Sequence, residues 1–147
     1  MKQSSEVLTH HEASGVYLLT RALQVSELEK IARTQGLAFF HVEGADIRSK
    51  EEFLNKSALA LRFPEYFGHN WDALQDCLTD MSWVEAKGYM VLYDRCEQFA
   101  ERSPQEFATV LEIFKESAEF WRTQGKPWFV VLQGDFQENW GLPSINL

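Results

Sequence analysis

Residues 103–132 read SPQEFATVLEIFKESAEFWRTQGKPWFVVL, and this stretch contains the repeating unit of the fold. The pattern Ser103-Pro104-x-Glu106 predicts a helix start, with the serine in a capping box and the proline at the first helical position. One helix face then carries apolar side chains at three- and four-residue spacing: Phe107, Val110, Leu111, Phe114, Ala118 and Trp121. After a Gly-Lys-Pro turn, the apolar run 128–132 is typical of a strand that is buried on both faces.

The same unit recurs towards the N-terminus. Strands are predicted at residues 15–20 (GVYLLT), 37–42 (LAFFHV) and 88–93 (GYMVLY). Capping-box patterns at Ser26-x-x-Glu29 and Ser49-x-x-Glu52 predict helices that end near Gly36 and Ala60. Apolar runs that alternate with amphipathic helices indicate an α/β fold, in which helices pack on a small parallel β-sheet. Residues 1–36 then form an N-terminal β-α extension, which we expect to add an edge strand.

Size and charge limit the classes of function. The chain has 147 residues, enough for one domain, and its 14 Lys and Arg against 22 Asp and Glu give a net charge of −8. A nucleic-acid-binding protein needs a basic surface, so we exclude that class. Cys77 and Cys96 form no CxxC motif and indicate reduced, buried thiols. Residues 1–20 contain no signal peptide and no apolar run approaches the roughly 18 residues of a membrane span, so we expect a cytoplasmic monomer without membrane contact.

Residues 64–86 read PEYFGHNWDALQDCLTDMSWVEA and carry the most unusual charge pattern of the chain. Asn70 is a good N-cap for a helix that begins with the next residue. The side chains expected to face the core are Trp71, Leu74 and Leu78. Those expected to form a second, exposed stripe are Asp72, Asp76 and Asp80. The segment holds five acidic residues and no Lys or Arg, so nothing within it neutralises the stripe.

Two interpretations of this acidic stripe are open. Like charges four residues apart destabilise a helix by about 0.2–0.5 kcal/mol per pair, and Asp80, in the last turn, is also unfavourable for the helix dipole. The stripe can be an ordinary solvated face. It can instead present carboxylates to a cationic partner, with Tyr66, Trp71 or Trp83 as aromatic contacts.

The same segment resembles the signature of the barstar family of ribonuclease inhibitors. PEYFGHNWDALQDCLT is similar to the family's Pro-Glu-Tyr turn and to its helix, which reads Asp-Ala-Leu and then Asp-Cys-Leu; Trp83-Val84-Glu85 matches the Trp-Val-Glu that follows. The similarity extends over residues 37–133. The extension 1–36 and a C-terminal tail, residues 134–147, lie outside it, within a single domain of residues 1–147. The resemblance implies a three-stranded parallel sheet packed by helices.

The resemblance also implies a function. Barstar-like proteins block the active site of a basic microbial ribonuclease with one helix and an adjoining loop, whose carboxylates mimic RNA phosphates. By this resemblance the chain is an inhibitor, of the immunity-protein or antitoxin kind, with Asp76 as the central carboxylate. Where the family has Trp on this helix, the chain has Gln75, which points to a different target. The residues expected to bind the partner are Tyr66, Asp72, Gln75, Asp76, Asp80, Trp83 and Glu116.

Two other classes of function stay open. The acidic surface equally suits a regulatory module whose basic protein partner is not a nuclease. A metal-dependent enzyme is the other class, because His69, Asp72 and Asp76 could share one helix face and hold an ion that activates water. No HExxH, GxSxG, P-loop or GxGxxG motif supports catalysis, and we predict no catalytic residue, metal ligand or cofactor.

Overall fold

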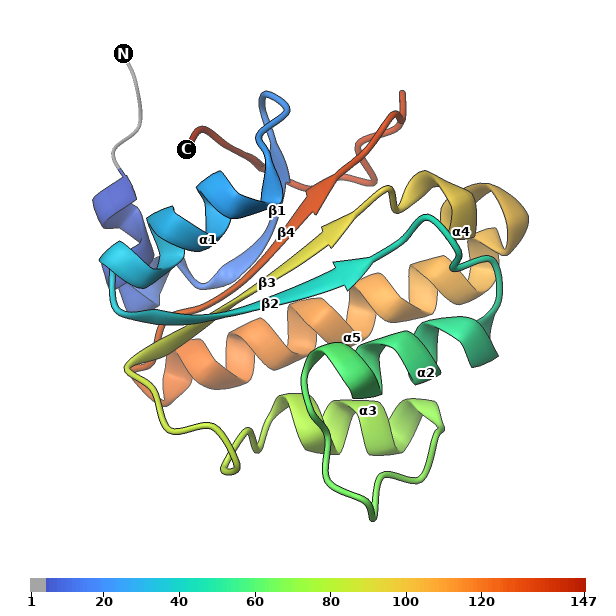
Figure 1. Ribbon diagram of the computed structural model, residues 1–147, viewed down its shortest axis with the longest axis horizontal. Coiled ribbons are helices and arrows are strands. Elements are labelled where there is room, and N and C mark those ends of the chain that lie inside the picture. The colour runs from blue at the N-terminus through green and yellow to red at the C-terminus, as the bar shows by residue number, and fades with distance from the viewer. Residues whose placement is uncertain (1–4) are drawn as a thin grey trace.

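The computed structural model of the chain describes residues 5–147, so the first four residues of the N-terminal extension lie outside the described part. Five parallel strands form one sheet in the order β2-β3-β4-β1-β5. Figure 1 labels the first four of them, β1 to β4. The strands are β1 (Gly15–Leu19), β2 (Leu37–Glu43), β3 (Gly88–Asp94), β4 (Trp128–Gln133) and β5 (Ser144–Ile145). This architecture confirms the predicted α/β fold with a parallel sheet packed by helices.

Helices cover both faces of the sheet (Figure 1). They are α1 (Val25–Thr34), α2 (Lys50–Ala60), α3 (Trp71–Leu78), α4 (Glu97–Arg102) and α5 (Pro104–Thr123), preceded by the 3-10 helices η1 (Ser5–Thr9) and η2 (His11–Ala13). Helix α1 packs on one face, whereas α5 and α2 pack on the other and α3 lies outside them, in contact with α5. Within residues 5–147 no helix is long and apolar enough to span a membrane.

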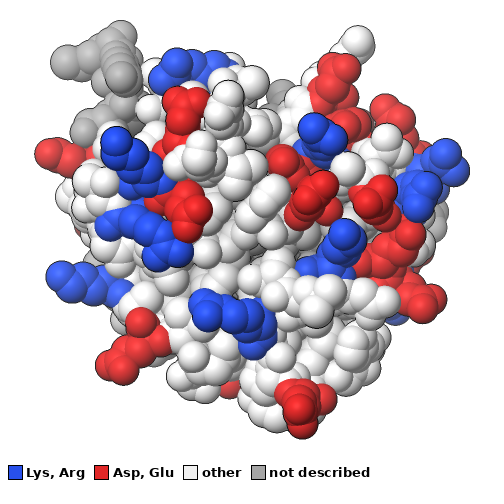
Figure 2. Space-filling view, viewed as in Figure 1, with Lys and Arg blue, Asp and Glu red and all other residues white. Residues whose placement is uncertain are grey.

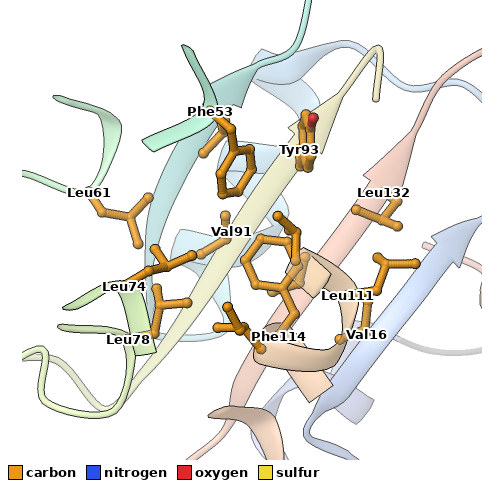
Figure 3. Packing of buried hydrophobic residues seen from close by; sticks show 14 of the residues in the cluster. Val16, Phe53, Leu61, Leu74, Leu78, Val91, Tyr93, Leu111, Phe114 and Leu132 are labelled. Atoms are coloured by element: carbon orange, nitrogen blue, oxygen red, sulfur yellow. The ribbon is translucent and has the colours of Figure 1, made fainter. Parts of the chain in front are cut away.

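The main core lies between the sheet and the helices α2 and α5, and α3 adds side chains to it from outside these two helices. Figure 3 shows side chains from these helices and from β3 converging in its interior. Phe53 of α2 is central, with its ring centroid 5.5 Å from that of Tyr93 and 6.1 Å from that of Phe114. Leu74 and Leu78 bring α3 into the same cluster and are fully buried. Because these two residues fix the inner face of α3, its opposite face is left to the solvent.

A second core covers the other face of the sheet and is built largely by residues outside the similarity to the barstar family. Leu28 of α1 and Ile145 of β5 pack there on Met90 and Phe129 of the central strands. Strand β1 pairs with β4 on one side and with β5 on the other. The N-terminal extension therefore adds a strand to the sheet, as expected, but this strand is not at the edge, because the C-terminal tail supplies the edge. The resemblance implied three strands, whereas the sheet has five.

Two of the predicted helix caps were also wrong. Helix α1 begins before Ser26: Gln24 is its N-cap, and the Gln24 backbone N–H donates to the Glu27 carboxylate at 3.3 Å. Ser103 precedes α5 as expected, but its hydroxyl donates to the Arg48 carbonyl at 3.1 Å and caps no helical amide. At α1 the capping box is formed by Gln24 and Glu27 instead, and at α5 the Ser103 hydroxyl is bonded to the distant Arg48 carbonyl.

Candidate protein-binding surface

Helix α3 is positioned by its cap and by the loop that leads into it. The Asn70 side-chain oxygen accepts a hydrogen bond from the Ala73 amide at 2.8 Å, which confirms the predicted N-cap. The loop after α2 takes left-handed φ values at Arg62 (56°) and His69 (53°), so the chain turns sharply at both ends of this connection. The first helical residue is Trp71, where the sequence placed it.

The exposed face of α3 carries carboxylates without basic partners. Asp72 and Asp76 are exposed on the helix, and Asp80 is exposed just beyond it. The predicted stripe was slightly too long, because α3 ends at Leu78 and the Thr79 hydroxyl donates to a helical carbonyl at 2.8 Å. Among the acid–base pairs within 4.0 Å between residues 5–147, none includes these three aspartates. By contrast, acidic and basic side chains are interspersed on the face in Figure 2.

Tyr66 stands at one end of this surface and is the most exposed aromatic residue, with 72% of its area accessible. Local desolvation, followed by the nearby Asp80 charge and the Cys77 side chain, raises the pKa of the Tyr66 phenol. The hydroxyl therefore stays protonated and can donate a hydrogen bond to a partner.

Glu116 of α5 joins the surface through a contact with α3. The Gln75 side-chain amide donates to the Glu116 carboxylate at 2.9 Å, across 41 residues of sequence. Gln75 is half-buried and Glu116 is exposed. Sequence reasoning placed both residues at the partner-binding surface but did not anticipate that they touch.

Trp83, like Gln75, is less exposed than the other predicted contact residues. It is half-buried, its indole N–H donates to the Leu61 carbonyl at 2.9 Å, and its ring meets Phe63 edge-on at 5.8 Å. It thus holds the α2–α3 loop and can offer a partner only the rest of its ring. Leu59, near the end of α2, has 79% of its area exposed, and the sequence did not lead us to predict it as a surface residue. Its exposure could have been predicted, because Leu59 does not lie on the helix face of α2 that carries the buried residues.

The residues considered for a metal site do not assemble into one. Within residues 5–147 no group of three or more His, Cys, Asp or Glu side chains is arranged to hold a metal ion. The His69 ring packs against Phe67, with centroids 4.7 Å apart, and its Nδ1 lies 3.1 Å from the Phe67 carbonyl oxygen. Desolvation, with the Asp80 and Asp76 charges, raises the pKa of the buried Cys77 thiol, so this group stays neutral.

An open cleft of about 770 Å³ lies elsewhere, at the carboxyl ends of β3 and β4, and contains none of the predicted site residues. Two of its carboxylates are already engaged within the chain. Glu97 accepts from the Asp135 amide at 3.1 Å, and Asp94 accepts from the Gly44 amide at 3.3 Å. The carboxylates of α3 have no such intramolecular partners in the described part of the chain, so we place the candidate surface there.

Comparison with known families identifies a match to this chain. The family model described as Barstar (barnase inhibitor) matches residues 37–133, which is more than half of the chain. The matched region runs from the first residue of β2 to the last residue of β4 and includes the whole acidic surface. Strands β1 and β5, with helix α1, lie outside it.

Proposed function

Since the chain belongs to the barstar family, we propose that it is a protein inhibitor that binds a basic ribonuclease and covers its active site with α3. The observation that carries this proposal is the exposed α3 face, on which Asp72 and Asp76 have no basic partner within residues 5–147. An acidic face with no internal neutralisation is suited to a cationic partner.

The chemistry of the target explains why carboxylates are suitable. A ribonuclease holds Arg, Lys or His side chains around the phosphate of its substrate, so a rigid array of carboxylates can replace that phosphate. Asp76 is the proposed central group, where it accepts charge-assisted hydrogen bonds, and Asp72 and Glu116 flank it. Tyr66 and the exposed part of Trp83 then exclude water from the rim.

The fold supports this role by holding the carboxylates in place before binding. Helix α3 is capped by Asn70 and anchored in the core by Leu74 and Leu78. A rigid helix loses little conformational freedom when it binds, so more of the interaction energy appears as affinity.

The proposal is tested by titrating the protein into barnase while RNA cleavage is followed, with Asp76→Ala as the variant and Asp46→Ala as the control. Asp46 is an exposed aspartate in the loop after β2 and is not one of the proposed contact residues. We expect stoichiometric inhibition by the wild-type protein and by Asp46→Ala. Loss of a charge that pairs in a desolvated interface weakens binding by about 2–5 kcal/mol, so Asp76→Ala should inhibit poorly.

A second candidate function is a regulatory module that binds a basic protein other than a nuclease. Gln75 favours it, because a polar side chain stands where the family has Trp. Failure of the wild-type protein to inhibit barnase would count against the inhibitor proposal and favour this alternative. Equal inhibition by wild type and Asp76→Ala would contradict the proposed role of the α3 carboxylates.

A further inference from the structure

We infer that Gln75 is a positioning residue, which orients the Glu116 carboxylate towards a guanidinium or ammonium group of the partner without cancelling its charge. This inference rests on the proposed function, because it assigns a role within the same acidic surface. It starts from the contact between α3 and α5.

The contact leaves half of the carboxylate available. The Gln75 Nε2 group donates to Glu116 Oε2 at 2.9 Å, a normal length for such a bond. Within residues 5–147, no hydrogen bond or ion pair is found at the other oxygen, Oε1, and the Glu116 side chain is exposed. One oxygen is therefore fixed, and the other is presented to the solvent.

The choice of a neutral donor matters. A Lys or Arg at position 75 could hold Glu116 equally well, but its positive charge would neutralise the carboxylate. An amide donates a hydrogen bond and adds no net charge, so Glu116 keeps its full charge for a partner. A cationic group that reaches Oε1 then forms a charge-assisted hydrogen bond, which is stronger than a neutral one.

The Gln75–Glu116 bond is not needed to hold the two helices together. The Trp121 indole N–H of α5 donates to the Leu78 carbonyl of α3 at 2.8 Å, in a buried position. Leu78 and Trp121 also pack in the main core. Because the helices are joined by these buried contacts, the bond at the surface can serve orientation. Fixing a long side chain in advance reduces the rotamer freedom that is lost on binding.

The experiment measures binding to barnase for Gln75→Met, Gln75→Lys and the control Gln105→Met. Methionine has nearly the shape of glutamine without its amide, and Gln105 is an exposed glutamine in the first turn of α5. We expect Gln75→Met to weaken binding roughly 3- to 10-fold, as for the loss of one hydrogen bond, and Gln105→Met to leave it unchanged. In a Glu116→Gln background, Gln75→Met should change affinity by less than about twofold, because the two residues act as a unit.

Gln75→Lys separates positioning from structural support. The lysine can still tie α3 to α5, so the thermal unfolding temperature should be unchanged or higher. Binding should nevertheless be weaker than for Gln75→Met, because the Glu116 charge is cancelled. Binding of Gln75→Lys at the wild-type level, or an effect of Gln75→Met that persists undiminished in the Glu116→Gln background, would overturn the inference.

Two further results distinguish a failure of this inference from a failure of the proposed function. If Asp76→Ala loses binding while Gln75→Met binds like wild type, this inference is wrong and the proposed function stands. If wild-type protein does not bind, or Asp76→Ala binds equally well, both fall together. The free protein offers a check without any partner: the Gln75 side-chain amide resonances should shift on Glu116→Gln, and unchanged resonances exclude the bond.

Discussion

The three aspartates of the acidic surface differ in what their local surroundings contribute. Asp72 lies in the first turn of α3, where the free amides of the helix favour a negative charge. Asp80 follows the C-cap residue Thr79, close to the negative end of the helix dipole. A carboxylate there is unfavourable for the folded state, so its presence is better explained by a partner than by stability.

This difference gives a prediction with opposite signs for two matched substitutions. Asp80→Asn should stabilise the protein and Asp72→Asn should destabilise it, each by about 0.3–1 kcal/mol at low salt. Urea unfolding followed by tryptophan fluorescence measures both. The same sign for the two variants would show that general charge repulsion, rather than the helix dipole, controls the stability of this helix.

At the scale of elements, features encoded within a few residues were predicted well from the sequence. The Asn70 cap of α3 and the apolar stripe of α5, from Phe107 to Trp121, are both present, because capping and helix periodicity depend on neighbouring residues. The Ser103 cap failed because its hydroxyl bonds to Arg48, which is 55 residues away. The Gln75–Glu116 contact was missed for the same reason, since a single sequence does not record which surface residues of two helices meet.

Strand β5 was missed because two residues show no periodicity, yet it completes the second core. Ile145 is 1% exposed there, whereas Ser144, its neighbour in the same strand, is exposed. We expect Ile145→Ala to destabilise the protein by about 2–4 kcal/mol, as for other large-to-small core substitutions, and Ser144→Ala to have almost no effect. Chemical denaturation provides the measurement. Equal small effects would show that the C-terminal tail adds little to the core.

For the molecule as a whole, the elements outside the family match and the acidic surface lie on different layers. Helix α1 and strands β1 and β5 complete the sheet and its second face, whereas α3 lies outside the opposite layer (Figure 1). The additions therefore enlarge the core without covering α3, and a partner can approach α3 as it would without them. The elements outside the family match therefore extend the side of the core that lies opposite α3.

The salt dependence of the association rate can distinguish the effect of the net charge from the effect of the charges on α3. The triple substitution of Asp72, Asp76 and Asp80 to Asn changes the net charge from −8 to −5, since three negative charges are removed. Conversion of the exposed Asp46, Asp135 and Glu138 to their amides gives the same net charge away from α3. If the α3 face steers a basic partner, the association rate of wild type should fall roughly tenfold or more between about 20 mM and 500 mM salt.

The two variants should then behave differently despite their equal net charge. The α3 variant should associate slowly with barnase and show a nearly flat salt dependence, because the charges that attract the partner are gone. The control variant should keep most of the wild-type rate and slope, since the α3 carboxylates that face the partner are intact. Stopped-flow fluorescence measures both rates. Equal slopes for the two variants would mean that total charge, and not its placement on α3, governs the encounter.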